Sequence, residues 1–277
     1  MDVETIALDE GSTHCFVKQE GNKLLFVKEF FPLGYKVGKK TFRILQAVDN
    51  RILKQINPFY HHRIFPKTNL AYLDKEIKTW QLWKEQGIQT LELERIEKWI
   101  IFWEYLKSQS LNQALNQKDS PQLFDQFIEV YDSIRSLAKR KQETNYLHSD
   151  PHLKNFLVSE NDYIIPIDSG CLINKKLSFP EIDFRLMNQT LCSILLLQTS
   201  NEAKTGYIKQ FKSMLSPEEI EKFITFNPNM GSSGKIYLKL REEVAYKVKG
   251  RDKKDVLQPV NHIEKLYNQY VKKIFAE

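Results

Sequence analysis

Three oxygen-bearing side chains flank a short apolar hairpin near the middle of this 277-residue chain. Asp150 and Asn155 lie five positions apart in the string His-Ser-Asp-Pro-His-Leu-Lys-Asn, and Asp168 follows thirteen positions after Asn155. Residues 156–158 and 163–168 are β-prone runs joined by a polar turn, a pattern typical of two paired strands. Because a hairpin returns toward its start, the sequence predicts that all three side chains meet at one site.

A carboxylate, an amide and a second carboxylate suit phosphoryl transfer, which depends on positioning and charge neutralisation more than on covalent chemistry. We predict that Asp150 is a catalytic base that orients or deprotonates a substrate hydroxyl. Asn155 and Asp168 are predicted to hold Mg²⁺ against the phosphates of ATP. The competing interpretation is an Asp/Asn-rich turn that only satisfies its own backbone.

A lysine interrupts an apolar run earlier in the chain. Lys28, in Leu-Leu-Phe-Val-Lys-Glu-Phe, is placed to reach the ATP phosphates, and Glu76 on an amphipathic helix is placed to pair with it. The alternatives are that Lys28 extends to the sheet edge and that Glu76 lies on the surface. Gly11 and Ser12, in a turn between two strands, are further candidates for ATP binding through backbone N–H groups. With one glycine, that signal is weak.

The order of the predicted elements separates strands from helices. Short β-prone runs occupy residues 5–8, 14–19, 24–30, 91–96 and 102–106. Helical spacing covers residues 41–56, 69–86 and 122–140, and most of the chain from Phe184 onward except around 227–234. This order predicts a two-lobed α+β fold with a cleft, in which residues 1–107 form a β-rich lobe with helices and residues 108–277 a mainly α-helical lobe.

The net charge of +6 is spread unevenly. Nine Lys and Arg residues accompany two acids between Lys28 and Lys67, and eight accompany three between Lys235 and Lys254. Such clusters attract ATP, a phosphorylated acceptor or an anionic membrane surface. An ordinary solvated face is the alternative. The sequence resembles no nucleic-acid-binding module, so we expect no specific nucleic-acid partner.

Cysteine content and hydropathy indicate the compartment. Three cysteines without close spacing favour a reducing environment over a disulfide framework or a zinc site. The N-terminal residues lack the apolar region of a secretory signal, and the apolar run 191–197 is too short to span a bilayer. We expect a cytoplasmic protein, with peripheral contact at the inner face of a membrane as an open alternative.

Together these residues resemble the protein-kinase-like superfamily over about residues 5 to 200. In this resemblance Lys28 matches the strand lysine, Glu76 its helix partner, and residues 102–106 the hinge that holds adenine through backbone groups. Asp150 matches the catalytic-loop Asp, and the two residues predicted as metal ligands match the Mg²⁺ ligands of the family. The resemblance implies a two-lobed protein-kinase-like fold that uses ATP and Mg²⁺.

The form His-x-Asp-x-His-x-x-Asn is more similar to the atypical branch of the superfamily than to regulated protein kinases. It is seen in aminoglycoside-phosphotransferase-like kinases and in the lipopolysaccharide-core (Kdo/heptose) kinases, which residues 181–186 and the helix before Gly87 also resemble. Ser149 replaces the Arg that senses a phosphorylated activation loop, and Ser169 replaces the aromatic residue of Asp-Phe-Gly. Activation by that route is therefore not expected.

The leading hypothesis is an ATP- and Mg²⁺-dependent kinase that phosphorylates a hydroxyl of a lipopolysaccharide-core sugar, another small molecule or a protein. Two alternatives stay open: an atypical protein Ser/Thr kinase, and a catalytically weak binding or scaffold protein on the same fold. The poor glycine loop and the long interval between Lys28 and Glu76, which holds an extra predicted helix, favour the scaffold.

Overall fold

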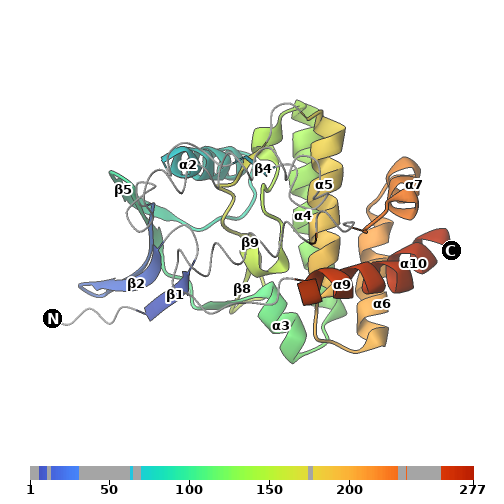
Figure 1. Cartoon of the computed structure of the whole chain (residues 1–277). Coiled ribbons are helices and arrows are strands. Elements are labelled where there is room, and N and C mark those ends of the chain that lie inside the picture. Colours follow the sequence, from blue (N-terminus) through green and yellow to red (C-terminus); the bar gives the residue numbers. More distant parts are fainter. Residues whose placement is uncertain are drawn as a thin grey trace.

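The computed structural model describes residues 6–10, 14–30, 63–64, 70–173, 177–229, 235 and 257–277. Within these residues an antiparallel sheet comes first and most of the helices follow (Figure 1). The predicted α+β class, with a β-rich first lobe and a mainly helical second lobe, is confirmed. The boundary after residue 107 stays a prediction. The predicted helix at 41–56 and the Gly11–Ser12 turn lie outside the described residues.

Five strands form the sheet of the first lobe in the order β1-β2-β3-β6-β5, and every neighbouring pair is antiparallel. They are β1 (Ile6–Glu10), β2 (His14–Glu20), β3 (Lys23–Glu29), β5 (Leu93–Glu97) and β6 (Ile100–Glu104). The turn between β2 and β3 has Gly21 at φ +60°, where the absence of a Cβ removes the steric cost. Tight turns between antiparallel neighbours explain why β-prone runs separated by turn residues predicted β2 and β3.

Alternation along β3 directs its lysine toward a helix. Val27 pairs with Phe102 of β6, and both belong to an apolar cluster on one face of the sheet. Lys28 pairs with Ile101, which packs on the opposite face. Helix α2 (Leu70–Glu85) contributes apolar side chains to that second cluster. Since successive strand residues point to opposite faces, Lys28 points toward α2.

Helix α2 is also bonded to the helical lobe. Lys75 Nζ and Thr79 Oγ1 donate to the backbone carbonyl of Asn145 at 3.2 and 3.1 Å. One turn further, Trp83 Nε1 donates to the carbonyl of Tyr146 at 2.7 Å. These side chains are spaced four residues apart and therefore share one face of the helix. The helix that covers the sheet is thus fixed to the segment that leads into the His148–Asn155 loop.

The helical lobe combines a small sheet with a group of helices. Strands β7 (Ser108–Ser110), β8 (Phe156–Ser159) and β9 (Ile164–Pro166) form the small sheet, and β4 (Arg63–Ile64) pairs with β10 (Leu172–Ile173). The α-helices are α3 (Leu111–Gln117), α4 (Pro121–Lys141), α5 (Phe179–Leu195), α6 (Asn201–Ser213), α7 (Pro217–Thr225), α9 (Leu257–Leu266) and α10 (Lys272–Ala276). Short turns at Thr144–Tyr146 and Leu153–Asn155 are 3₁₀, and Tyr267–Val271 is a π-helical segment between α9 and α10.

Helix α5 begins at Phe179, earlier than the predicted start at Phe184. Ser178 precedes the helix, and its backbone N–H donates to Glu181 Oε2 at 2.9 Å. Pro180 lies in the first turn, where a missing N–H has no cost. A capping box with a proline in the first turn is a strong helix start, so local capping explains the difference.

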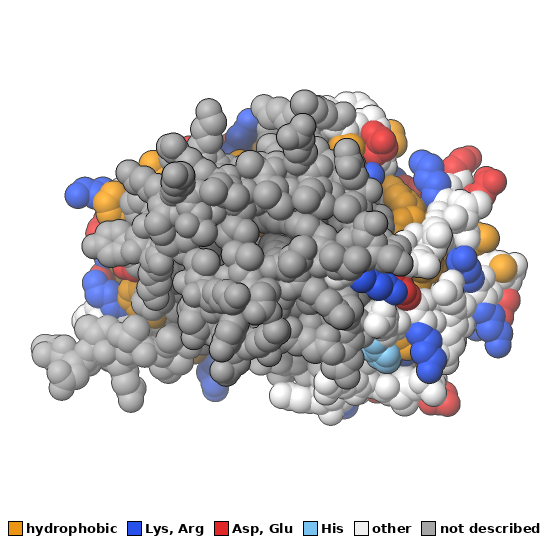
Figure 2. Space-filling view, in the orientation of Figure 1, with side chains coloured by type: hydrophobic (Ala, Val, Ile, Leu, Met, Phe, Trp, Pro, Cys, Tyr) orange, Lys and Arg blue, Asp and Glu red, His pale blue; other side chains and the backbone are white. Residues whose placement is uncertain are grey.

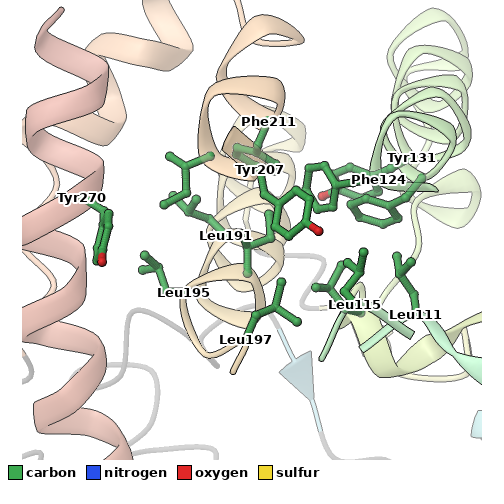
Figure 3. Packing of buried hydrophobic residues seen from close by; sticks show 14 of the residues in the cluster. Leu111, Leu115, Phe124, Tyr131, Leu191, Leu195, Leu197, Tyr207, Phe211 and Tyr270 are labelled. Carbon is green, nitrogen blue, oxygen red and sulfur yellow. The ribbon is translucent and has the colours of Figure 1, made fainter. Parts of the chain in front are cut away.

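The main apolar core lies between α4, α5 and α6. Figure 3 shows Tyr131 and Phe124 of α4 facing Tyr207 and Phe211 of α6, with Leu191 of α5 beside them. In Figure 1, α4 and α5 run side by side. Their packing gives the helical lobe a rigid centre.

A buried ion cluster joins three helices beside this core. Arg135 of α4 is 1% exposed and donates twice to the Asp183 carboxylate, with both distances at 2.9 Å. Its Nη2 also lies 2.8 Å from Glu219 Oε1 of α7. Removing one member of such a cluster leaves a buried charge unpaired, at about 3–5 kcal/mol. The cluster therefore fixes α5 against α4.

No described helix has the length and apolar character needed to cross a membrane. On the face seen in Figure 2, Lys and Arg side chains of the described helices are interspersed with Asp and Glu. Most of both predicted basic clusters falls outside the described residues.

Candidate functional site

A cavity of about 650 Å³ lies between the sheet of the first lobe and the β8–β9 hairpin of the second. Its size is in the range of small-molecule and cofactor sites. Val17 of β2 and Leu157 of β8 supply apolar walls, and residues 104–106 after β6 line another side. Lys28, Glu76, Asn155 and Asp168 line the polar part. Four of the five described candidate residues thus share one cavity.

Lys28 connects two carboxylates at the base of this cavity. Its Nζ lies 2.6 Å from Glu76 Oε2 and 2.7 Å from Asp168 Oδ1. Lys28 and Glu76 are each 5% exposed, whereas the Asp168 side chain is 46% exposed. The Lys28–Glu76 pair that the sequence predicted is therefore present, and the same lysine also holds the distant Asp168.

The three charges set one another's protonation. Burial disfavours the charged form of Lys28, but Asp168 and Glu76 outweigh burial and hold the pKa of Lys28 above its ordinary value. The positive charge of Lys28 lowers the pKa of Asp168, while burial raises the pKa of Glu76. One cation beside two carboxylates leaves excess negative charge, and Asp168, which is half-buried and has a lowered pKa, is the group that keeps it. That charge faces the cavity and favours a cation there.

Gly170 allows the segment after Asp168 to approach α2 closely. A Cβ at this position would lie 3.0 Å from Glu76 Oε2 and 3.0 Å from the backbone carbonyl of Tyr72. The left-handed backbone in this turn occurs at Asp168, with φ +58°, a conformation that Asp tolerates better than most residues. The turn thereby directs the Asp168 carboxylate to Lys28 while Gly170 packs against the helix.

The His148–Asn155 loop is held by hydrogen bonds among its own residues. Asn155 Nδ2 donates to the carbonyl of Asp150 at 2.8 Å, and the backbone N–H of His152 donates to the same carbonyl at 2.8 Å. The Ile167 N–H donates to the Asn155 carbonyl at 2.9 Å. The loop and the end of the hairpin are therefore joined next to Asp168, as the sequence predicted.

His148 is a structural member of this loop. It is 1% exposed, its ring lies between Trp83 and Phe156, and its Nδ1 accepts from the Asp150 N–H at 3.2 Å. Burial lowers the pKa of His148 to about 4, although Asp150 and Asp168 act in the opposite direction. The imidazole is therefore neutral at pH 7, as its acceptor role requires.

Three side chains of helix α5 form hydrogen bonds with this loop, and the sequence analysis did not predict them. Gln189 Nε2 donates to Asp150 Oδ1 at 2.5 Å. Thr190 Oγ1 donates to the carbonyl of Pro151 at 3.0 Å. Ser193 Oγ accepts from a backbone N–H in the loop, at 3.3 Å. The signal in the sequence was a group of polar residues inside an otherwise apolar helix. The structure shows that these polar side chains are buried, where they need hydrogen-bond partners.

The two serines at atypical positions contact each other. Ser149 Oγ donates to the backbone carbonyl of Ser169 at 2.7 Å, and both residues are buried. This bond joins the loop directly to the Asp-Ser-Gly turn. The turn is therefore held by the neutral hydroxyl of Ser149 and not by a charged side chain at that position.

The oxygen donors fit a magnesium ion. Asn155 uses its Nδ2 on the loop, which directs its Oδ1 to the other side of the amide, and Asn155 lines the cavity. Asp168 adds a charged carboxylate. Mg²⁺ prefers oxygen ligands and is usually held by one or two side chains together with phosphates and water. Within the described ranges, no group of three or more His, Cys, Asp or Glu forms a metal site.

The structure brings together five predicted residues from four separate segments, namely Lys28, Glu76, Asp150, Asn155 and Asp168. Gly11 and Ser12 lie outside the described residues, so their predicted contact with phosphates stays a prediction. A strand lysine paired with a helix glutamate, a loop Asp with Asn five residues later, and an Asp after a hairpin define a protein-kinase-like arrangement.

Comparisons with known proteins find matches among solved structures, 279 chains in all. No protein-family model and no curated protein matches the chain. The structure of WaaP in complex with acyl carrier protein shares 14% identity at a TM-score of 0.43, covering 96% of this chain and 90% of that chain. Choline kinase LicA from Streptococcus pneumoniae shares 14% identity at a TM-score of 0.35, covering 100% of this chain and 94% of that chain.

The close approach at Gly170 gives a first prediction. Gly170→Ala should push the Asp168 turn away from α2 and lengthen the contact between Glu76 and Lys28, since the Tyr72 carbonyl cannot move without shifting the helix. Overpacking of this kind destabilises by about 1–3 kcal/mol, measurable by urea unfolding and by a crystal structure of the variant. Gly206→Ala, in α6 with nothing within 4 Å, is the control and should stabilise by about 0.5–1 kcal/mol. Equal effects at both glycines would contradict the close-approach argument.

The buried imidazole gives a second prediction. Between about pH 6.5 and 4 the unfolded chain binds a proton at His148 that the folded chain excludes, so stability falls as the pH falls through this window. The loss reaches about 3 kcal/mol at the acid end. His148→Gln keeps an acceptor for the Asp150 N–H but does not titrate, so its deficit relative to wild type should shrink between pH 7 and 4.5. Urea unfolding measures this, with His262→Gln as the exposed control. A constant deficit would contradict it.

Proposed function

We propose that this protein is an ATP- and Mg²⁺-dependent phosphotransferase that transfers a phosphoryl group to a hydroxyl. The observation that carries the proposal is the bridge from Lys28 to both Glu76 and Asp168 at 2.6 and 2.7 Å. A buried lysine between two carboxylates is costly to assemble, and it is the arrangement that phosphate positioning requires.

Each described residue then has a chemical role. Lys28, oriented by Glu76, can exchange its bond to Asp168 for one to a phosphate oxygen. Asp168 and Asn155 would hold Mg²⁺, which neutralises phosphate charge during transfer. Residues 104–106 offer backbone groups to an adenine between the apolar walls. Lys154 also lines the cavity. Its positive charge would lie near the ATP phosphates, beside the residues proposed to hold Mg²⁺.

Asp150 acts on the acceptor. It is 8% exposed and lies on the loop beside Asn155, close to the proposed metal. A carboxylate at this position orients the acceptor hydroxyl and receives its proton as the oxygen attacks phosphorus. The acceptor class that we propose is a hydroxyl on a sugar or another small molecule. A lipopolysaccharide-core sugar is one member of this class, and a protein side chain is the competing acceptor.

A weakly active scaffold is the second candidate. The single glycine between β1 and β2 and the long interval between Lys28 and Glu76 are the features that favour it. The complete set of base, amide and carboxylate supports the enzyme. Peripheral contact with an anionic membrane stays a proposal that concerns the basic clusters and is independent of the site.

The third prediction separates binding from transfer. Asp150→Ala should leave Mg²⁺-ATP affinity within about twofold while lowering phosphate transfer about 10²- to 10⁴-fold. Asp168→Asn should weaken Mg²⁺-ATP binding at least about tenfold, because a metal ligand loses its charge. Thermal shift with Mg²⁺-ATP measures binding. Release of labelled phosphate from ATP, to water and to a panel of sugars and small hydroxyl compounds, measures transfer.

Asp125→Ala, at an exposed position on α4, is the matched control and should change neither value. Full transfer activity in Asp150→Ala would reject the base assignment. ATP binding without turnover on any acceptor would favour the scaffold, and absence of metal-dependent ATP binding would reject both candidates.

A further inference from the structure

Helix α5 reaches the reactive side chain of the site as well as the backbone around it. Thr190 and Ser193 bond to backbone groups of the loop. Gln189 instead donates from Nε2 to Oδ1 of Asp150 at 2.5 Å. This bond joins α5 to the carboxylate itself and not to the loop backbone. Gln189 is therefore the α5 side chain in a position to influence the chemistry.

Burying this amide carries a cost that packing does not explain. Gln189 is 2% exposed, and its Oε1 is buried without a hydrogen-bond partner within the described part of the chain. A buried polar group left unsatisfied costs about 1–3 kcal/mol. An apolar side chain of the same length would fill the site without that cost. The bond to Asp150 is the interaction that accounts for an amide here.

Asp150 also fixes which way the amide points. An ionised carboxylate accepts hydrogen bonds and cannot donate them, so Nε2 and not Oε1 must face it. His152 Nε2 lies 3.5 Å from the same oxygen, Oδ1. Two nitrogen groups thus converge on one carboxylate oxygen.

We infer that Gln189 is a positioning residue of the phosphotransfer site, which holds Oδ1 of Asp150 through Nε2–H, sets the rotation of the carboxylate and directs the acceptor proton to Oδ2. This inference rests on the proposed function. During transfer the acceptor O–H bond breaks, and its proton passes to Oδ2 of Asp150. The acceptor oxygen forms a bond to the γ-phosphorus, and the bond between that phosphorus and the β,γ-bridging oxygen breaks. ADP leaves with the electron pair.

The structural test uses isosteric variants on one helix. Gln189→Leu removes the donor while keeping the volume, and crystal structures should show the Asp150 carboxylate rotated or in several orientations. Thr190→Val removes a hydrogen bond from the same helix to the loop backbone and should leave that carboxylate unchanged. If the carboxylate keeps its wild-type orientation in Gln189→Leu, the proposal is overturned. This readout does not depend on activity.

The kinetic test uses phosphate release from Mg²⁺-ATP. Gln189→Leu should lower kcat by about 10- to 100-fold, as expected for a misplaced reactive group, with KM for ATP unchanged. Thr190→Val should stay within about threefold of wild type, as a structural substitution away from the reacting atoms. If kcat fell equally in both variants, Gln189 would only stabilise the loop in a general way, and the proposal would be rejected.

A wild-type protein without turnover would reject the proposed function, while the crystal structures would still decide the role of Gln189.

Discussion

The contact of one buried lysine with two carboxylates is the interaction on which the site depends. Lys28 belongs to the sheet, Glu76 to the helix that covers it, and Asp168 to the turn that leaves the second lobe's hairpin. Each charge is tolerated because the others are present, since an isolated buried charge would cost several kcal/mol. The same contact fixes the strand, the helix and the turn relative to one another. The cavity therefore keeps its shape through electrostatics as well as through apolar packing.

The second support of the site is α5. Its position depends on the Arg135 cluster, which bonds α4 to Asp183 at the start of the helix. Further along, Gln189 and Thr190 contact the loop. A rigid helix that is fixed at one end can hold a loop side chain more accurately than loop residues alone. The two supports meet at the loop, which Ser149 joins to the turn after Asp168.

Local patterns predicted most of the longer elements and most of the site, because β-prone runs, helical spacing and a five-residue motif are short-range signals. The short elements β4, β7, α3 and β10 were not predicted. The local patterns located β3, α4 and the hairpin, and they brought Asp150, Asn155 and Asp168 together. The contact between Lys28 and Asp168 was missed because it spans 140 positions, and Gln189 was missed because it lies 39 positions from Asp150. Neither contact produces a periodic pattern in the sequence. The start of α5 was predicted too late because apolar spacing was given more weight than the capping residues before it.

The bonds from α2 to the carbonyls of Asn145 and Tyr146 have a consequence for how nucleotide would leave. Although α2 covers the sheet of the first lobe, these bonds attach it to the helical lobe, so we expect it to move with that lobe. If the cavity widens by movement of the five-stranded sheet against α2, that movement stretches the contact between Lys28 and Glu76. For a phosphotransferase, release of ADP would therefore be coupled to the strength of that ion pair. Turnover would then be limited by product departure as readily as by chemistry.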